Sequence, residues 1–245
     1  MKVICIASGK GGVGKSSISI GLALALKKRG KKVGVLDLDL QSPSVAIMTG
    51  TLGVELNASD RVKPVDRNGV KIFSMDYLIP EGAAILWKGN EIENWIPDFF
   101  KIDWGDLDIL IVDLPPGMIP HEISGLKKSV NIEGVVLVTT PQDVALASVK
   151  KMIFSCKEYG LPVIGIIENM SGYKCPKCGE VVEIFRSGGG ERLAKSVGIP
   201  MISSIPLNPM VCYEGDDGSS KTMSEMLESS GAVDKILKII EGEVK

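Results

Sequence analysis

Residues 8–16 carry the clearest chemistry in the sequence. They read Ser-Gly-Lys-Gly-Gly-Val-Gly-Lys-Ser and fit the pattern G-x-x-x-x-G-K-[ST], with Gly9, Gly14, Lys15 and Ser16 at the fixed positions. Glycines allow successive backbone N–H groups to point inward at an anion. In loops of this kind the lysine reaches the β- and γ-phosphates of a nucleotide, and the hydroxyl binds Mg²⁺. The segment therefore predicts binding of a nucleoside triphosphate such as ATP.

The segments on either side of this loop have the spacing of a strand and a helix. Residues 3–7 form an apolar run before it, and Ile18, Leu22 and Leu26 recur at helical spacing after it. A helix that begins at the loop directs its positive N-terminal end at a bound anion. A glycine-rich turn that binds nothing is therefore the weaker interpretation. We predict that the nucleotide contacts a continuous run of residues: Gly9, Lys10, Gly11, Gly12, Val13, Gly14, Lys15, Ser16 and Ser17.

A second lysine lies inside the loop, because Lys10 precedes Lys15 by five positions. A side chain on a glycine-flanked loop can point away from its own nucleotide and stabilise transition-state charge in a second subunit, as an arginine finger does. A solvated loop lysine is the alternative. Residues 10–16 resemble the deviant Walker A group of P-loop ATPases, which share K-G-G-x-G-K-[ST]. That resemblance implies that the first lysine acts across a nucleotide-sandwich dimer.

The strand predicted over 32–38 leads into two carboxylates, Asp37 and Asp39. Alternate residues of an extended segment share a face, so both can point toward the crevice at the carboxyl end of the sheet, where ligands bind. We assign Asp39 to positioning the attacking water and Asp37 to holding Mg²⁺ through water. Two solvated strand-end acids are the alternative. Residues 37–44 resemble the switch I region of the same ATPases.

The apolar run 107–113 ends in Asp113 and has the form of a Walker B strand. Asp113 should accept hydrogen bonds from the water ligands of Mg²⁺, close to Ser16. Gly117 can present a backbone N–H to the γ-phosphate, and the two prolines before it stiffen the segment. Such a segment can report whether ATP or ADP is bound. We assign this switch II to Asp113, Pro115, Pro116 and Gly117.

Two further segments provide candidates for contact with the base. Asn169 follows a strand predicted over 162–167, at the same edge of the sheet as the loop. Its side chain offers a donor and an acceptor to the edge of adenine, although asparagine is also common in turns. Pro206 and Leu207 follow a late strand, over 201–205, and are candidates for a wall of the adenine pocket.

Cys175 and Cys178 form the second chemical signal. Residues 175–179 read Cys-Pro-Lys-Cys-Gly, which places two thiolates on a tight turn, and Gly179 allows backbone N–H groups to approach sulfur. A structural zinc or a [4Fe–4S] cluster normally takes four thiolates. The three remaining cysteines are Cys5, Cys156 and Cys212. Only Cys212, in a later loop, is a candidate third ligand.

This half-site predicts that two chains meet face to face, each giving Cys175 and Cys178, in agreement with the dimer that Lys10 indicates. Three interpretations stay open: an iron–sulfur cluster, a zinc ion and a redox-active pair. The redox pair is the weakest because that motif opens a helix. The residues around this turn instead favour a β-turn, in a loop between Ser171 and Phe185.

Six segments together resemble the Mrp family, the ApbC-like P-loop iron–sulfur carriers. They occur in that family's order and spacing along nearly the whole chain: 10–16, 113–117, 139–142, 168–171, 175–179 and 205–209. The resemblance implies ATP hydrolysis, a labile [4Fe–4S] cluster held between two subunits, and its transfer to apo iron–sulfur proteins. Met118 departs from the family pattern, in which a small polar residue is usual. A positioning ATPase of the MinD/ParA type, with a structural zinc at the dimer contact, is the alternative.

Composition agrees with a single P-loop ATPase domain over 1–245, with the cysteine turn (171–186) inside it. Hydrophobic residues make up 44% of the chain, which suits a doubly wound, mostly parallel α/β sheet flanked by helices. No apolar run reaches the roughly 18–20 residues that span a bilayer. A net charge of −2 gives no footprint for nucleic acid, so we expect neither a membrane nor a nucleic-acid partner. Five cysteines without a leader sequence indicate a reducing cytoplasm.

Periodicity predicts the remaining elements. Strands are expected over 2–7, 32–38, 70–74, 107–113, 134–139, 162–167 and 201–205. Helices are expected over 15–29, 90–100, 142–158, 219–230 and 231–243, with a short one inside 181–197 and the last one packed on the core. Residues 50–107 are the least legible. Lys88-Gly89 is a candidate turn near the dimer interface. The aromatic side chains of this region favour core and subunit contacts over base stacking: Trp87, Trp95, Phe99, Phe100 and Trp104.

Overall fold

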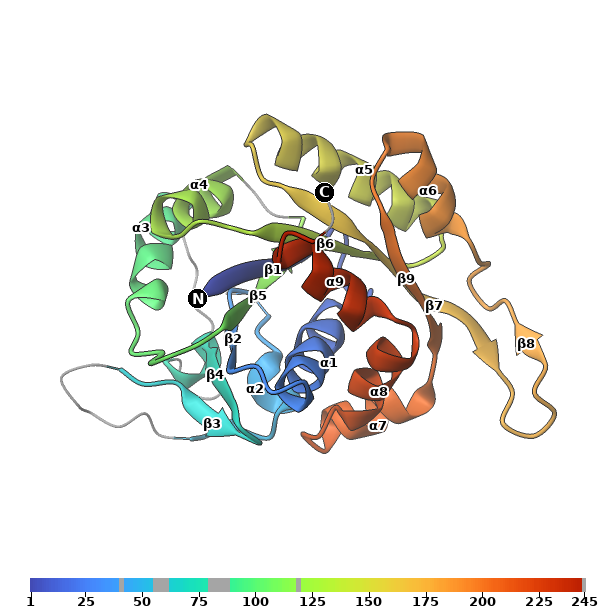
Figure 1. The fold of residues 1–245 in the computed structure, drawn as a ribbon, viewed down its shortest axis with the longest axis horizontal. Helices are drawn as coiled ribbons and strands as arrows, with labels where there is room; N and C mark the ends of the chain where they lie inside the picture. The colour runs from blue at the N-terminus through green and yellow to red at the C-terminus, as the bar shows by residue number, and fades with distance from the viewer. Residues whose placement is uncertain (40–41, 55–61, 79–88, 118–119, 244–245) are drawn as a thin grey trace.

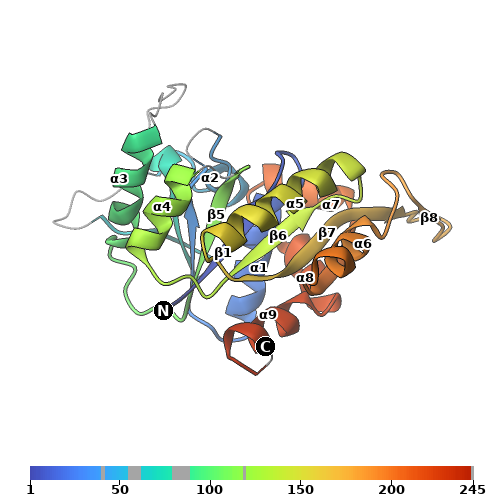
Figure 2. The ribbon, with the colours of Figure 1, turned by 90° about the horizontal axis from the view of Figure 1, so that it is seen from above.

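Apolar strands alternate with helices along the chain and fold into three layers, with a central sheet between two layers of helices (Figure 1 and Figure 2). The computed structural model describes residues 1–39, 42–54, 62–78, 89–117 and 120–243. The N-terminal strand lies in the middle of the sheet, and the first helix covers it on one side.

The bounds of the elements are as follows. The strands are β1 Lys2–Ser8, β2 Val33–Asp37, β3 Val65–Arg67, β4 Val70–Ser74, β5 Ile109–Pro116, β6 Gly134–Thr139, β7 Val163–Lys174, β8 Val181–Val182 and β9 Met201–Leu207. The helices are α1 Lys15–Lys28, α2 Val45–Met48, α3 Gly89–Phe100, α4 Pro120–Ser129, α5 Asp143–Glu158, α6 Gly189–Val197, α7 Pro209–Asp216, α8 Lys221–Ser229 and α9 Ala232–Ile240. A 3₁₀ turn, η1, spans Met75–Tyr77.

The order of the strands across the sheet is β3-β4-β2-β5-β1-β6-β7-β8, and β9 also pairs with β7. The described pairs are parallel except for β3 with β4 and β7 with β8, which are antiparallel. The parallel strands all bring their carboxyl ends to one edge of the sheet, so the segments that follow β1, β2, β5 and β7 meet there. The predicted doubly wound, mostly parallel α/β fold is confirmed.

Side chains along β1 divide the core into two halves, because successive residues of a strand point to opposite faces. Val3 and Cys5 belong to the cluster that α3, α4, α5 and α6 cover. Ile4 and Ile6 belong to the cluster that α1, α8 and α9 cover. The strand is therefore apolar at every position from Val3 to Ala7, and its sequence does not show the alternation between the two faces.

The segment between residues 171 and 186 differs from its prediction as a loop. β7 continues through Lys174 and pairs with β8, with Tyr173 opposite Val182 and Lys174 opposite Val181. The prediction of a loop between Ser171 and Phe185 is therefore wrong, because the backbone hydrogen bonds between strands continue beyond the part of the sheet that helices cover. We call residues 171–186 the cysteine hairpin. Figure 1 shows it extending beyond the helices at one side of the molecule.

Several aromatic residues of the 50–107 region build the core, as predicted. Trp104 is buried, and its Nε1 donates to the Phe99 carbonyl at 3.1 Å. The Phe73 ring lies 5.9 Å from the ring of Phe99. Trp95 is exposed on α3. Trp87 and Lys88 lie outside the described residues, and their predicted contacts stay predictions.

The C-terminal helix α9 packs on the sheet rather than standing apart from it. Val233 and Ile236 are fully buried, and Ile240 is nearly so, in the cluster that includes α1 and α8. The prediction of core packing for this helix is confirmed. Among the described helices, none is long and apolar enough to cross a bilayer.

Gly21→Ala in α1 should destabilise the protein, although alanine normally adds about 1 kcal/mol to a helix interior relative to glycine. A Cβ at Gly21 would lie 2.5 Å from Met223 Cγ and 3.1 Å from the Met223 carbonyl carbon, so α8 would have to shift. We expect a loss of about 1–3 kcal/mol in urea denaturation, partly recovered in the Gly21→Ala/Met223→Ala double variant. Equal or greater stability of the single variant would contradict this close packing.

Candidate functional site

The loop between β1 and α1 is shaped by its glycines in two different ways. Gly12 and Gly14 have φ values of +78° and +85°, in the left-handed region that glycine adopts without strain. Gly14 also has no room for a side chain, because a Cβ there would lie 2.2 Å from Asn169 Nδ2. Gly9 is required by packing alone, since its Cβ would lie 2.5 Å from the backbone of Ser148 in α5. Backbone angle and close approach together therefore explain Gly9, Gly12 and Gly14, whereas neither applies to Gly11.

Asp113, at the end of the predicted Walker B strand, gathers the polar groups at the start of α1. Its buried carboxylate accepts hydrogen bonds from Lys15 Nζ at 2.8 Å, Ser16 Oγ at 2.6 Å and Ser19 Oγ at 2.7 Å. The Lys15 side chain is only 7% exposed, so water screens this ion pair weakly. The structure thus brings together the residues predicted for Mg²⁺, Ser16 and Asp113. Ser19 was not predicted, although its position four residues after Lys15 puts it on the same face of α1.

Asp37 lies beside Asp113, because the register of β2 and β5 pairs the two residues. It is fully buried, and its carboxyl oxygens accept bonds from the backbone N–H groups of Asp39 at 3.0 Å and Val45 at 3.1 Å, and from Ser74 Oγ at 3.2 Å. Burial, and after it the neighbouring Asp113 carboxylate, raise the pKa of Asp37 to about 7. Oδ2 thus holds the first turn of α2 and the end of β4, while Oδ1 accepts the bond from Asp39 N. The predicted contact of Asp37 with magnesium-bound water stays a prediction.

A cavity of about 370 Å³ lies beside the loop, and residues 10–17 line it continuously. Asp39 is 8% exposed and lies on the wall of this cavity, where the predicted role of positioning water requires it. Lys10 is exposed at the rim, and its backbone carbonyl accepts a bond from Ser8 Oγ at 3.0 Å. Residues 40–41 of the predicted switch I segment lie outside the described residues.

A second cavity, of about 290 Å³, adjoins the first, and Gly14, Ser17 and Met48 line both. The residues predicted to contact the base all line the second cavity: Asn169, Pro206 and Leu207. The Nδ2 atom of Asn169 donates to the Val13 carbonyl at 2.9 Å. One of its two amide N–H donors is thus bonded to the loop, and the other N–H and the side-chain oxygen remain for the predicted contact with the edge of a base.

Sequence reasoning missed α7, which supplies Val211 and Cys212 to the base cavity. A signal for this helix was present: Asn208 accepts a bond from Met210 N at 3.0 Å as an N-cap, and Pro209 fills the first position. Cys212, the candidate third metal ligand, lies on this helix. Within the part of the chain that the structure describes, no three side chains of His, Cys, Asp or Glu are grouped to hold a metal ion. The suggestion of Cys212 as a ligand is therefore wrong for a single chain.

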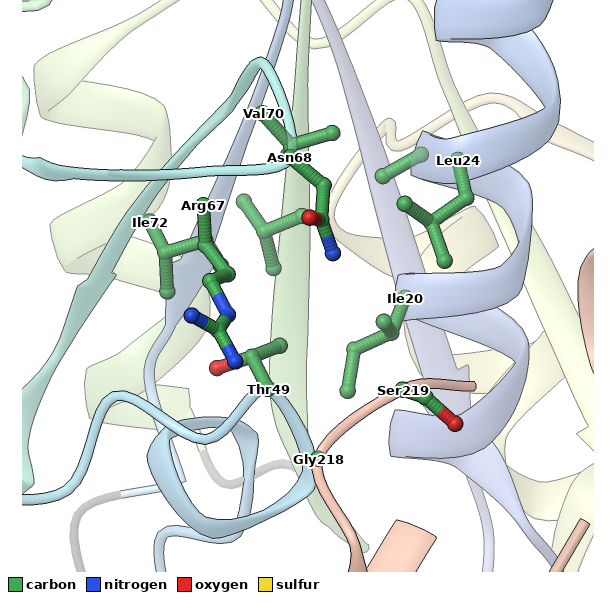
Figure 3. Close-up of a pocket in the computed structure, with 11 residues that line it drawn as sticks. Ile20, Leu24, Thr49, Arg67, Asn68, Val70, Ile72, Gly218 and Ser219 are labelled. Atoms are coloured by element: carbon green, nitrogen blue, oxygen red, sulfur yellow. The ribbon is translucent and has the colours of Figure 1, made fainter. Parts of the chain in front are cut away.

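A third cavity lies between α1 and the first strands after it, and Figure 3 shows its lining. Ile20 and Leu24 border it from the helix, and Arg67 and Asn68 border it from the β3–β4 turn. Its volume is about 10 Å³, which is about enough for one water molecule. We assign no ligand to this gap in the packing.

The segment after Asp113 is more strand-like than predicted, because β5 continues through both prolines and Pro115 is buried. The backbone N–H of Gly117 donates to the Ser8 carbonyl at 2.8 Å. Continued pairing of β1 with β5 thus takes up this N–H in this structure, and its predicted contact with the γ-phosphate stays a prediction. Met118 lies outside the described residues.

The tip of the cysteine hairpin holds Cys175 and Cys178 on a closed turn. Cys175 N donates to the Glu180 carbonyl at 2.9 Å, and Gly179 N donates to the Cys175 carbonyl at 2.9 Å. The backbone N–H groups of Cys178 and Lys177, followed by the Cys178 thiol, lower the pKa of the Cys175 thiol. A thiolate is the form that binds metal, so this turn fits half of a four-thiolate donor set. The turn joins two strands and opens no helix, unlike a thioredoxin-type redox motif.

Comparisons with known proteins agree with this combination of sites. Residues 1–242 match the family described as the NUBPL iron-transfer P-loop NTPases. The chain is 39% identical to an iron–sulfur cluster carrier protein of Methanocaldococcus jannaschii, over 97% of this chain and 82% of that protein. It is 40% identical to a cytosolic Fe–S cluster assembly factor, a NUBP2 homolog of Trichoplax adhaerens, over 97% of this chain and 92% of the relative. The chain therefore belongs to the NUBPL iron-transfer P-loop NTPase family.

Solved structures show the same architecture. A nucleotide-binding protein from Archaeoglobus fulgidus, in complex with ADP, superposes with a TM-score of 0.78 at 34% identity, over 90% of this chain and 87% of that one. The septum site-determining protein MinD from Pyrococcus horikoshii, complexed with Mg-ADP, gives a TM-score of 0.67 at 22% identity, over 100% of this chain and 96% of that one. The second likeness is one of fold alone.

The environment of Asp37 predicts a dependence of stability on pH. An acid whose pKa is raised on folding stabilises the protein fully below its unfolded pKa, and that contribution is lost as the pH rises through the folded pKa. For Asp37 the window runs from about pH 4 to about pH 7. The stability of the wild type minus that of Asp37→Asn should fall by about 1–4 kcal/mol across it, in urea denaturation at constant ionic strength. The exposed acid variant Asp98→Asn is the control, and a flat difference for Asp37→Asn would contradict its burial as an ionisable group.

Proposed function

We propose that this protein binds and hydrolyses ATP with Mg²⁺, and that two copies hold a [4Fe–4S] cluster between them for transfer to apo iron–sulfur proteins. The observation that carries the proposal is the presence in one chain of a phosphate-binding loop and an exposed two-cysteine hairpin. The names of the relatives, an iron–sulfur cluster carrier and a cytosolic Fe–S cluster assembly factor, support it. The second name also supports a location in the cytoplasm.

The residues of the nucleotide cavity have distinct roles in this proposal. The N–H groups of the loop and the N-terminus of α1 receive the triphosphate. Ser16 Oγ and the Asp113 carboxylate are 2.6 Å apart and offer hard oxygen atoms to Mg²⁺ or its water ligands. Ser16 and Asp113 would hold the cation, whose charge would weaken the Lys15–Asp113 ion pair, and the Lys15 ammonium group would then be available to the β- and γ-phosphates. Asp39 positions the attacking water, and Asp37, beside Asp113 on the neighbouring strand, holds Mg²⁺ through water.

Two features support the homodimer in this proposal: Lys10 at the nucleotide cavity and the two cysteines of the hairpin. Lys10 is exposed at the rim of the nucleotide cavity, where it can reach the nucleotide of a facing copy. Cys175 and Cys178 supply two thiolates, and a [4Fe–4S] cluster takes four. Apolar side chains lie next to them on the hairpin and give a surface that a second copy can cover: Val181, Val182 and Ile184, which are 63%, 47% and 49% exposed. Zinc fits the same thiolates, so metal identity is part of the test.

Replacement of the hairpin cysteines tests the cargo. After anaerobic reconstitution, the wild type should elute as a dimer of the 26.2 kDa chain with the visible absorbance of a cluster and about four iron atoms per dimer. Cys175→Ser/Cys178→Ser should lose the absorbance, the iron and the metal-dependent dimer, whereas Cys212→Ser should keep all three. Iron retained by the double variant would contradict the proposal, and one zinc per dimer in place of iron would assign the hairpin a structural metal instead.

Mixing two variants tests whether Lys10 acts in trans. Lys10→Ala should still bind ATP but hydrolyse it about tenfold more slowly or worse, since trans-acting cationic residues contribute at least that much in related reactions. Lys15→Ala should lose ATP binding while keeping an intact Lys10. A mixture of the two should recover hydrolysis, because Lys10 of one copy then serves the intact site of the other. Lys150→Ala, on the exposed side of α5, is the control, and a mixture as inactive as its components would show that Lys10 acts within its own chain.

A further inference from the structure

Glu168 joins the two ends of the cysteine hairpin. Its side chain is fully buried, and Oε1 accepts hydrogen bonds from Ser171 Oγ at 2.6 Å and from Gly188 N at 3.0 Å, while Oε2 accepts one from Gly190 N at 2.5 Å. Ser171 begins the hairpin, and the two glycines follow it at the start of α6. One carboxyl group therefore holds both the point where the chain leaves the sheet and the point where it returns.

The next residue, Asn169, connects the same stretch of β7 to the nucleotide cavities. Neighbouring residues of a strand point to opposite faces, and Asn169 Nδ2 donates to the Val13 carbonyl of the phosphate-binding loop at 2.9 Å. Asn169 and Met170 both line the base cavity. Three consecutive residues thus contact the hairpin ends on one side and the nucleotide site on the other.

The backbone changes direction between these anchors and the cysteines. Met170 has a φ of +57°, and Gly172 has a φ of +76°. A left-handed backbone costs a non-glycine residue about 1–2 kcal/mol, so Met170 keeps it only because its surroundings impose it. The register between β7 and β9 is also interrupted between Asn169 and Tyr173. The hairpin therefore departs from the sheet at a bend whose first residue borders the base cavity.

A helix cap alone accounts for only part of this arrangement. A carboxylate that accepts N–H bonds from Gly188 and Gly190 stabilises the N-terminus of α6. The bond to Ser171 and the placement of Asn169 on the loop add nothing to such a cap. The predicted switch II lies on β5, which β1 and β6 separate from β7, so the β7 bend is the more direct connection between nucleotide and hairpin.

We propose that residues 168–171 form a mechanical link through which a bound nucleotide sets the position of the cysteine hairpin, with Glu168 as its positioning residue. The link gives the proposed carrier a way to change the exposure of its thiolates with the nucleotide state, and it rests on the proposed function. The link requires that the hairpin can take two positions relative to the sheet. A nucleotide that contacts Met170 and Asn169 shifts the equilibrium between these positions only if it binds one of them more tightly than the other.

Hydrogen exchange of the full chain tests this link without any metal. In the wild type, a non-hydrolysable ATP analogue with Mg²⁺ should change the exchange rates of amides in 173–186 by about fivefold or more, the lower range of measured couplings. Glu168→Gln keeps the size of the side chain, but its NH₂ group cannot accept a bond from Gly190. The variant should bind the analogue within about threefold of the wild type and show no nucleotide-dependent change in the hairpin.

Zn²⁺ affinity gives an independent readout of the same coupling. The analogue should change the affinity of Cys175 and Cys178 for Zn²⁺ in the wild type, and by reciprocity Zn²⁺ should change the affinity for the analogue by the same factor. In Glu168→Gln that factor should fall to about one. A role for Glu168 in stability alone would lower the unfolding midpoint and leave the factor unchanged.

Glu214→Gln is the matched control. Glu214 also binds the start of a helix, where its carboxylate accepts bonds from Thr222 N at 2.5 Å and Thr222 Oγ1 at 2.7 Å, but it has no bond to the hairpin among the described contacts. This variant should lose a comparable cap and keep the nucleotide response of the hairpin. Ser171→Ala removes a single hydroxyl and decides the matter if Glu168→Gln does not fold, since it should weaken the response by at least about threefold.

Two results would overturn the inference. Wild-type protein that binds the analogue with no change in the hairpin would overturn the link alone, and the proposed function would stand. An equal response in the wild type and in the variants Glu168→Gln or Ser171→Ala would also overturn it. Failure of the wild type to bind the analogue would instead overturn the proposed function, and this inference with it.

Discussion

The site depends on one buried ion pair, between Lys15 of the phosphate-binding loop and Asp113 at the end of β5. Charges removed from water need close partners, so the loop, α1 and the sheet must be aligned before this pair can form. No lysine donates to the neighbouring carboxyl of Asp37 among the contacts of the described residues, and burial, followed by the nearby Asp113 carboxylate, raises its pKa to about 7. One positive charge is thus balanced by one carboxylate, while the second carboxyl retains its proton more readily and holds α2 through backbone bonds.

Much of the fold and of the loop could be predicted because the sequence states them directly. The parallel strands are apolar at successive positions, and the glycines, Lys15 and Ser16 stand at fixed spacings after the first of them. Asp37 and Asp39 could be placed at the correct edge of the sheet. Their different surroundings could not, because the partners of Asp37 are backbone N–H groups and Ser74, which no side-chain pattern reveals.

The cysteine hairpin escaped prediction for a related reason. Residues 171–174 have the sequence Ser-Gly-Tyr-Lys, without the apolar alternation of a covered strand, because no helix layer packs over them. Their strand form comes from ladder bonds to β8 and from the anchors at Glu168. The cysteine spacing predicted the chemistry of the tip. The connection between the tip and the nucleotide cavities could not be predicted, because it depends on hydrogen bonds from both ends of the hairpin to the Glu168 carboxylate.

The turn that favours the thiolate of Cys175, as the proposed metal site requires, also makes this sulfur easier to oxidise. Backbone N–H groups that favour its thiolate increase the form of sulfur that oxidants attack. Cys178 lies in the same turn, and a disulfide between the two cysteines would remove both thiolates from the proposed metal site until a thiol reductant restored them. Cys5 is fully buried, and burial raises the pKa of its thiol, so both effects protect it from oxidation. The proposed binding of metal and a sensitivity to oxidants therefore both follow from the same short turn.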